Sequence, residues 1–379
     1  MNRIRLPYRS LVPAAPWIPM FAVLLSLVLT FGGMTRSLFA GTTVGVITVG
    51  STKDWGYNEA QAVAGKTLKK IPGVKVVVQD NVPETIAVTQ TMQSMINFDN
   101  AKVIFATSYG YFPFVCKLAP KYPGVLFVHC GGDYVPGKTP KNVATYFGDV
   151  DEVEYLTGIV AGYTTKTNKL GFIAAKPIPQ VLRDINAFTL GAMSVNPKAT
   201  CTVIFTGDWF QPVKEAQSVN SLADQGIDVV TMHVDSPKQI ILTAKSRGIY
   251  VCGYHFNGAK LYPKGFLTGS AWNWAPIYKE LVMDKMAGKP FPHSIMQGFR
   301  DGVVKLDPFG PAVSMKAKMA ALAVKKLFLA GKFQIFKGPL YSNTGKLVIP
   351  AGVIYHDADP KLDSMNYLVK GVIGKISWN

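Results

Sequence analysis

Short apolar runs rich in β-branched residues alternate along the chain with longer segments that carry apolar residues at helical spacing. The first run, residues 44–49, leads through a turn at residues 51–54 into a helical pattern at residues 57–71. A second helical pattern covers residues 85–98. Further strands are predicted at residues 75–79, 103–107, 125–129 and 143–147. Strands that alternate with helices of this size predict an α/β fold, with a parallel sheet covered on both faces.

The same alternation starts again after residue 150, with a helix predicted at residues 152–165 and a strand at residues 170–175. The later elements of this second series are helices at residues 181–195, 213–225 and 237–247 and strands at residues 202–205, 229–233 and 250–254. Two successive series of similar length predict two Rossmann-like lobes with parallel sheets. Beyond them we expect helices at residues 276–287 and 314–330 and a hairpin around residues 336–349.

The first forty residues follow a different pattern. Arg3, Arg5 and Arg9 precede an uncharged stretch whose apolar part is densest at residues 18–31, and small residues follow at residues 37–41. A basic start, an apolar middle and a small-residue exit are typical of a secretory signal, so we predict a signal peptide at residues 1–40. The cleavage site stays open.

An uncleaved membrane anchor is the alternative, because no charge interrupts residues 10–35. Three prolines and two glycines in that window disfavour a spanning helix of about 20 residues. No cysteine precedes Cys116, so a lipobox is absent. We therefore expect a periplasmic protein.

Charge and cysteine usage narrow the function classes. The 379 residues carry a formal charge of +17, but the basic residues are scattered without a long basic tract, which disfavours nucleic acid as a partner;. The four cysteines lack C-x-x-C or zinc spacing, so no metal or cofactor is expected. Their apolar neighbours favour buried free thiols, although export permits a disulfide. The four are Cys116, Cys130, Cys201 and Cys252.

Ligands of open parallel sheets bind outside the carboxyl ends of the strands. The segments that follow predicted strands are rich in aromatic residues, small residues and single polar groups, and poor in groups that could run covalent chemistry. They are residues 51–58, 108–112, 207–211, 235–237 and 255–257.

Several of these segments resemble a known family. Asp54-Trp55-Gly56-Tyr57-Asn58, between a strand and a helix, is similar to an element of the basic membrane lipoprotein (BMP) family. The likeness continues in order through residues 142–146, 152–158, 186–191, 209–212, 235–237 and 272–274 and ends near residue 303. It spans almost all of the chain after the predicted signal.

The resemblance implies a substrate-binding protein of an ABC importer with the type I periplasmic-binding fold, in which two lobes are joined by a hinge. Lobe 1 would hold residues 41–148 plus about 271–300. Lobe 2 would hold residues 149–270 plus about 301–379. The implied ligands are purine nucleosides or bases, the implied partner is a permease in the inner membrane, and a monomer is expected.

In the family an aromatic side chain from each lobe sandwiches the base, and Tyr57 and Trp209 match those positions. Stacking on aromatic faces contributes roughly 1–3 kcal/mol per base. The alternative makes Tyr57 a packing residue at a helix start and Trp209 a rim residue. Asp54 and Asn58 could read a base edge, or could instead cap the helix that follows them.

Two departures from the nucleoside-binding pattern favour a ligand without a sugar. His255 stands where many members carry an Asp, and Trp272 stands where nucleoside binders carry a Lys for the sugar. Losing charged partners for ribose favours a compact purine base, with adenine as the first choice. A nucleoside or another heterocycle is the alternative.

The remaining candidate ligand-binding residues are chosen by their position after a strand or by their place in the motifs that resemble the family. Trp55 and Asp235 belong to those motifs, and Ser108 and Tyr109 follow a strand, although core packing explains Tyr109 nearly as well. Arg183 could reach the ligand or pair elsewhere on its helix. The five histidines form no metal pattern, and no Walker motif or G-x-S-x-G elbow occurs, which disfavours an enzyme. A sensor domain of the same fold is the other alternative class.

Overall fold

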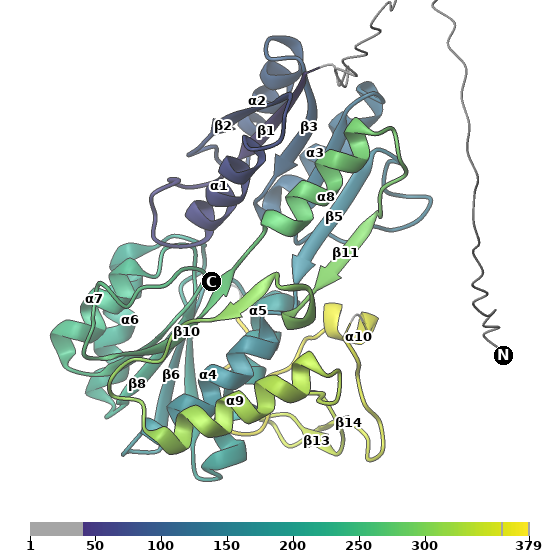
Figure 1. Ribbon diagram of the computed structural model, residues 1–379. Helices are drawn as coiled ribbons and strands as arrows, with labels where there is room; N and C mark the ends of the chain where they lie inside the picture. The colour runs from purple at the N-terminus through teal and green to yellow at the C-terminus, as the bar shows by residue number, and fades with distance from the viewer. Residues whose placement is uncertain (1–40, 358, 378–379) are drawn as a thin grey trace, which may run out of the picture. The chain divides into compact units, whose positions relative to one another are not determined.

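The computed structural model describes residues 41–357 and 359–377, so the predicted signal peptide at residues 1–40 lies outside the described residues. The described residues form two large parallel sheets and a small hairpin (Figure 1). Among these residues, no helix combines the length and the hydropathy that a membrane span needs.

The first sheet has six strands in the order β11-β5-β4-β3-β1-β2, and all its pairs are parallel. Its strands are β1 Thr42–Ile47, β2 Val74–Gln79, β3 Ala101–Ala106, β4 Leu126–Cys130, β5 Val143–Gly148 and β11 Ser294–Gln297. On one face α1 (Tyr57–Leu68) packs beside α8 (Ala275–Met286). The other face carries α2 (Ile86–Asn97) and α3 (Phe112–Leu118).

The second sheet has seven strands in the order β12-β10-β9-β8-β6-β7-β15, with β12 antiparallel to β10 and the other pairs parallel. Its strands are β6 Lys169–Ala174, β7 Thr200–Phe205, β8 Val229–His233, β9 Tyr250–Gly253, β10 Phe266–Trp272, β12 Val304–Leu306 and β15 Val372–Ile373. The helices α4 (Asp151–Thr164), α5 (Pro179–Val195) and α9 (Met315–Leu329) pack together, while α6 (Pro212–Asp224) packs against α7 (Lys238–Arg247) (Figure 1).

The backbones of α4 and α5 touch because glycines face each other across the pair. A Cβ atom added to Gly158 would lie 2.1 Å from the carbonyl oxygen of Phe188, and one added to Gly191 would lie 2.0 Å from that of Tyr155. No side chain fits at either distance. Close packing of α4 on α5 therefore depends on both glycines.

The chain passes between the two sheets three times. The passages lie at residues 149–150, 273–274 and 298–303, because α4 packs with the second sheet and α8 packs with the first. The tail adds the hairpin predicted around residues 336–349, made by β13 (Leu340–Tyr341) and β14 (Leu347–Ile349), and a short helix α10 (Pro360–Asp363).

The α/β fold with two parallel sheets is confirmed, but six of the strands and α-helices described were not predicted. They are β10, β11, β12, β15, α3 and α10. The first three complete the sheets beside the passages between them.

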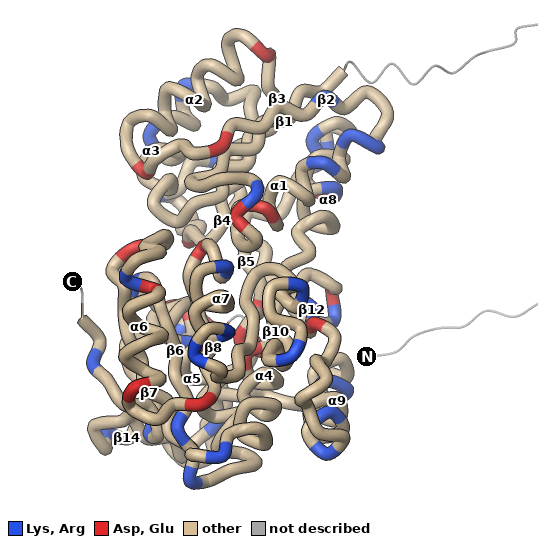
Figure 2. Tube along the Cα trace, turned by 90° about the vertical axis from the view of Figure 1, so that its left-hand side faces the viewer, with Lys and Arg blue, Asp and Glu red and all other residues tan. Residues whose placement is uncertain are grey.

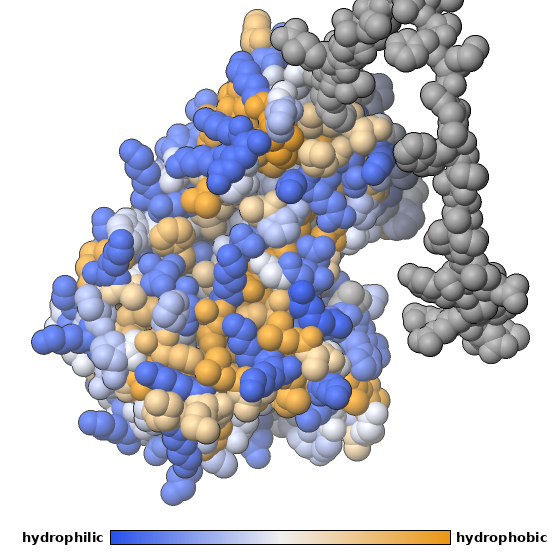
Figure 3. Space-filling view, in the orientation of Figure 1, coloured by the Kyte–Doolittle hydropathy of each residue, from blue (hydrophilic) through white to orange (hydrophobic). Residues whose placement is uncertain are grey.

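Charged and apolar side chains are mixed over the described surface. Lys and Arg lie on helices and loops around both sheets, with several on α9 (Figure 2). On the face shown in Figure 3, hydrophobic side chains are interspersed with hydrophilic ones.

Candidate functional site

A small cavity lies where the carboxyl ends of strands from both sheets meet. It has a volume of about 30 Å³, and we call it the inner cavity. Its lining residues are Tyr57, Ser108, Tyr109, Cys130, Gly131, Phe147, Gln180, Trp209, His233, Asp235 and His255. Beside it lies a wider outer cleft of about 720 Å³, lined on its polar side by Lys53, Glu84, Asp208 and Lys238 among others. Trp209 and Asp235 line both spaces and therefore stand between them.

Aromatic rings line the inner cavity from both sheets. Tyr57 begins α1 on the first sheet, and its hydroxyl donates to the carbonyl oxygen of Thr107 at 2.5 Å. Trp209 follows β7 of the second sheet and is 8% exposed. The Trp209 ring centroid lies 6.4 Å from that of Tyr109 and 6.2 Å from that of His233. The structure thus brings the predicted pair Tyr57 and Trp209 to one cavity, on different sheets.

Asp54 caps the start of α1. Its Oδ1 accepts from the backbone N–H of Gly56 at 2.8 Å and of Glu59 at 3.0 Å, and its Oδ2 accepts from the backbone N–H of Asn58 at 3.0 Å. Burial raises the pKa of Asp54. Asp54 borders the outer cleft but not the inner cavity. Its carboxylate is therefore engaged mainly with the helix.

Asn58 connects Asp54 to Asp235. Its Nδ2 donates to Asp54 Oδ2 at 2.7 Å and to Asp235 Oδ2 at 3.3 Å, while its Oδ1 accepts from the Gly50 N–H at 3.1 Å. Burial raises the pKa of Asp235 well above its ordinary value, and the charge of Asp54 adds to the rise. A carboxyl group held toward its protonated form can donate as well as accept, so Asp235 can offer either role to the inner cavity.

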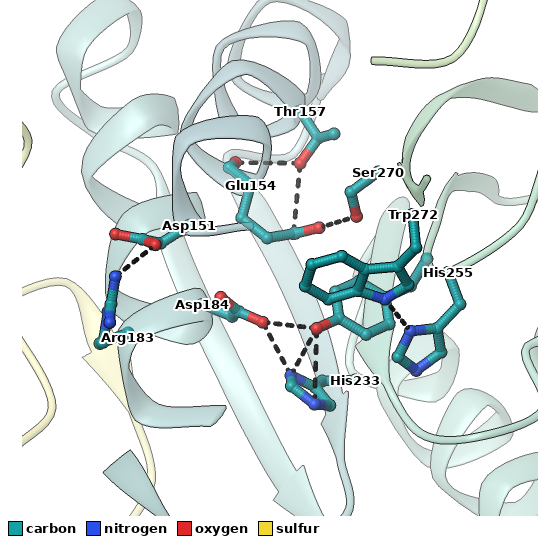
Figure 4. Close-up of polar contacts among 10 residues, drawn as sticks. Asp151, Glu154, Thr157, Arg183, Asp184, His233, His255, Ser270 and Trp272 are labelled. Atoms are coloured by element: carbon teal, nitrogen blue, oxygen red, sulfur yellow. Dashed lines mark hydrogen bonds and ion pairs between the residues drawn. The ribbon is translucent and has the colours of Figure 1, made fainter. Parts of the chain in front are cut away.

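His255 and Trp272 act together. The indole Nε1 of Trp272 donates to Nδ1 of His255 at 2.7 Å (Figure 4). The Trp272 ring stacks on Trp274, with centroids 4.2 Å apart, and does not line the inner cavity. His255 does line it, with a backbone φ of 66°. Trp272 is therefore a support for His255 rather than a wall of the cavity.

Ser108 and Tyr109 both line the inner cavity. The Ser108 hydroxyl donates to Glu84 Oε1 at 2.6 Å. Tyr109 is 41% exposed and lies at the rim, with its ring edge toward Trp209.

Arg183 and Trp55 lie elsewhere. The Arg183 guanidinium is buried in an acidic cluster, with Nη2 at 2.7 Å from Asp151 Oδ1 and 3.2 Å from Asp149 Oδ1. These two aspartates stand where the chain first passes between the sheets. Burial raises the pKa of Asp151 to about 7, although the Arg183 charge opposes the rise. Trp55 packs edge-on against Phe256 and lines neither space.

The sequence pattern did not single out His233, which lines the inner cavity at the end of β8. Its Nδ1 lies 2.7 Å from Asp184 Oδ2 (Figure 4). The Tyr254 hydroxyl donates to the same oxygen at 2.8 Å. Gln180 was also missed, and its Nε2 donates to the carbonyl oxygen of Gly131 at 3.0 Å. The sequence signal that could have found His233 was its position as the last residue of a predicted strand.

Direct contacts between the two sheets close the site. The Tyr57 N–H donates to the carbonyl oxygen of Asp235 at 2.9 Å, and the Ser236 hydroxyl donates to that of Asp54 at 2.7 Å. Lys176 Nζ, beside the second sheet, lies 3.4 Å from Glu84 Oε2 beside the first, and 2.9 Å from Asp208 Oδ1 on its own side. The structure therefore shows the two sheets in a closed arrangement.

Within residues 41–357 and 359–377, no group of three or more His, Cys, Asp and Glu side chains is placed to hold a metal ion. The four cysteines are free thiols, with Cys116 partly exposed and Cys130, Cys201 and Cys252 buried.

Two parallel α/β sheets that meet at a cavity beside the carboxyl ends of their strands define the type I periplasmic-binding fold;. An ABC transporter solute-binding protein from Conexibacter woesei has this fold, with a TM-score of 0.64 and 20% identity over 78% of this chain and 98% of its own. At that identity the likeness concerns the fold.

The chain belongs to the Bmp family of PnrA-like ABC transporter substrate-binding proteins, which it matches over residues 41–329. This confirms the predicted family. Proteins of this family bind solutes for transport and are not enzymes.

Two relatives differ in the solute that they are named for. A purine-binding protein of Brucella abortus is 33% identical over 335 residues, covering 88% of this chain and 93% of its own length. A putative ABC transporter glucose-binding protein of Haloferax volcanii is 33% identical over 239 residues, covering 63% of this chain and 60% of its own length.

Proposed function

We propose that this substrate-binding protein holds a purine base, with adenine as the first choice, and delivers it to an ABC permease of the inner membrane. The observation that carries the proposal is the pair of aromatic side chains, Tyr57 and Trp209, which line one cavity from different sheets. The faces of a flat heterocycle would stack on these rings. The relative from Brucella abortus, named for purine binding and similar along most of its length, supports the same ligand class.

The size and lining of the inner cavity favour a base over a nucleoside. Its volume of about 30 Å³ is close to the share of one water molecule in the liquid;. Even a bare purine needs several times that space, so the sheets must part and Trp209 must shift for the ligand to enter. A ribose would need a still larger displacement. Lys53 and Lys238 line the outer cleft, and Lys176, whose Nζ lies 5.1 Å from the centroid of the Trp209 ring, is paired with Glu84 and Asp208.

We also propose that each sheet with its helices is one lobe of a hinged clamp, with lobe 1 at residues 41–148 plus about 271–300 and lobe 2 at residues 149–270 plus about 301–379. The three passages at residues 149–150, 273–274 and 298–303 would serve as the hinge. Ligand would bind one open lobe, the other lobe would close on it, and the closed form would dock on the permease.

The signal-peptide hypothesis for residues 1–40 and the periplasmic location belong to the same proposal. The mass of the protein recovered from the periplasm would test both. A chain that keeps its first forty residues in the membrane fraction would favour the anchor instead.

Isothermal titration calorimetry with adenine, adenosine and glucose tests the ligand. We expect adenine to bind at least about tenfold more tightly than adenosine, and we expect no binding of glucose. Mass spectrometry of solute that co-purifies with the protein gives an independent measurement. A protein that binds glucose or adenosine more tightly than adenine contradicts the proposed ligand.

A further inference from the structure

Two histidines border the inner cavity on the side of the second sheet. His233 ends β8, and His255 follows β9 by two residues. Their ring centroids lie 5.8 Å apart and their planes are nearly perpendicular, at 84°. Each ring has its Nδ1 engaged with a different kind of group, and this difference fixes where each ring carries its hydrogen.

The hydrogen of His255 is assigned by Trp272. An indole Nε1 can only donate, so Nδ1 of His255, at 2.7 Å, must accept;. A neutral imidazole then carries its hydrogen on Nε2. Burial lowers the pKa of His255 well below its ordinary value and so favours the neutral ring, although the backbone of Val234 opposes the fall. Nε2 is buried and has no partner in hydrogen-bonding geometry among the described residues.

The hydrogen of His233 is assigned by Asp184. A carboxylate oxygen accepts, so the short contact of 2.7 Å between Asp184 Oδ2 and His233 Nδ1 places the hydrogen on Nδ1;. The Tyr254 hydroxyl donates to the same oxygen at 2.8 Å. The Nε2 atom of His233 has one long contact, to the Tyr254 hydroxyl at 3.4 Å.

We propose that His255 and His233 form a fixed donor and acceptor pair that reads one edge of the bound heterocycle. His255 Nε2–H donates to a ring nitrogen or carbonyl oxygen of the ligand, and His233 Nε2 accepts from a ligand N–H. This inference rests on the proposed purine ligand and specifies it further. The ligand class is a flat heterocycle that carries an acceptor and an N–H donor next to each other on one edge.

The pair selects ligands because both histidine side chains are buried, His233 at 5% and His255 at 3% exposure. A ligand that lacks the N–H leaves the His233 acceptor unpaired, and a buried unpaired group costs about as much as the hydrogen bond it replaces. Sites built from such groups reject analogues that lack the partner. Adenine meets the requirement at its amino group beside a ring nitrogen and again at its N9–H beside N3.

The experiment combines one protein change with two ligand changes. His233→Phe keeps a ring in place and removes the acceptor. Unsubstituted purine lacks the amino group of adenine, and 9-methyladenine lacks the N9–H. Calorimetry on wild type should show a loss of at least about tenfold relative to adenine for one of these two ligands. For the His233→Phe variant, the loss of affinity for that ligand relative to adenine should fall to about threefold or less.

His293→Phe is the matched control, because His293 is a partly buried histidine that stacks on Tyr134 and does not line the inner cavity. It should keep the wild-type ratios. Equal ratios in wild type and His233→Phe would overturn the role of His233.

Nitrogen-15 NMR of the wild-type histidines tests the hydrogen assignment without any substitution. The expected result is a hydrogen on Nε2 of His255 and on Nδ1 of His233. A hydrogen on Nδ1 of His255, or on Nε2 of His233 with or without one on Nδ1, overturns the pair. If wild type binds no purine while the NMR assignment holds, the proposed ligand has failed and the donor and acceptor pair has not.

Discussion

At the scale of single residues, the structure separates side chains that face the inner cavity from those that hold them in place. Tyr57, Trp209 and His255 line the cavity, whereas Trp272 reaches it only through its hydrogen bond to His255. Asp54 supports α1 through three backbone N–H groups. A change in a lining residue should therefore alter affinity with little effect on folding.

Trp209→Ala tests this separation. Loss of the stacking surface should weaken adenine binding by at least about tenfold, since one stacked base is worth roughly 1–3 kcal/mol. The thermal unfolding midpoint should stay close to that of wild type. Lys69→Ala, at an exposed position just after the end of α1, is the control and should bind like wild type. Equal affinities for all three proteins would exclude the aromatic sandwich.

Asp307 gives a prediction for pH. Burial raises its pKa to about 7, and its Oδ2 is buried without a partner among the described residues. The folded state therefore holds a proton on Asp307 that the unfolded chain releases near pH 4, so stability from this group is lost as pH rises from about 4 to 7. Asp307→Asn should stabilise the protein by roughly 2 kcal/mol more at pH 8 than at pH 5.

Urea unfolding at the two pH values measures the Asp307 effect. Glu280→Gln, which changes an exposed carboxyl group, should show the same small effect at both. If Asp307→Asn gives the same stability change at pH 5 and pH 8, Asp307 is ionised at both values and the argument fails.

Sequence position predicted some site residues and not others. Tyr57, Trp209 and His255 lie in segments that follow strands and stand at positions compared with the family, so both signals pointed to them. His233 is the last residue of its strand, where alternation suggests a core side chain. Arg183 lies in the first turns of α5, but its partners Asp149, Asp151 and Asp363 come from two other segments that sequence alone does not bring together.

At the scale of elements, the regular βα series could be predicted and the short pieces could not. Each helix and strand of the two main series has an apolar pattern long enough to recognise. By contrast, β10 contains Thr268, Gly269 and Ser270, and β11 has only four residues, Ser294–Gln297. These strands are specified by the sheet edges that they join, which is tertiary information.

The contact between α4 and α5 gives a prediction at this scale. Gly158→Ala should lower stability by about 1–3 kcal/mol, because a methyl group would overlap the Phe188 carbonyl and push the helices apart;. Thermal unfolding measures the change. Gly124→Ala is the control, because a Cβ at Gly124 would have no atom within 4 Å. Equal unfolding midpoints for the two variants would show that α4 and α5 can separate without loss.

At the scale of the whole described chain, the family and the fold could be predicted from the sequence. The contacts that join the two sheets could not. Those contacts join residues far apart in sequence, such as Ser236 to Asp54, which are 182 positions apart. Their geometry follows from how the two sheets meet. No local pattern encodes it.

Closure should be sensitive to Gly56. A Cβ added to Gly56 would lie 1.9 Å from the carbonyl oxygen of Asp235 and 2.6 Å from Cδ of Pro237. Gly56→Ala should therefore block full closure, weaken adenine binding by about tenfold or more, and leave thermal stability nearly unchanged. Small-angle X-ray scattering should show less compaction on adding adenine than in wild type, with Gly124→Ala as the control. Full compaction of Gly56→Ala would contradict this role for the glycine.

The three passages of the chain between the sheets also govern the order of folding during synthesis. The first sheet needs β11 at its edge and α8 on its face, yet residues 149–272 are made before either. The N-terminal part must therefore wait, incomplete, while most of the second sheet leaves the ribosome. A chaperone that shields the unfinished edge at β5 would act during that interval, and a fragment ending at residue 148 would lack the parts that complete its sheet.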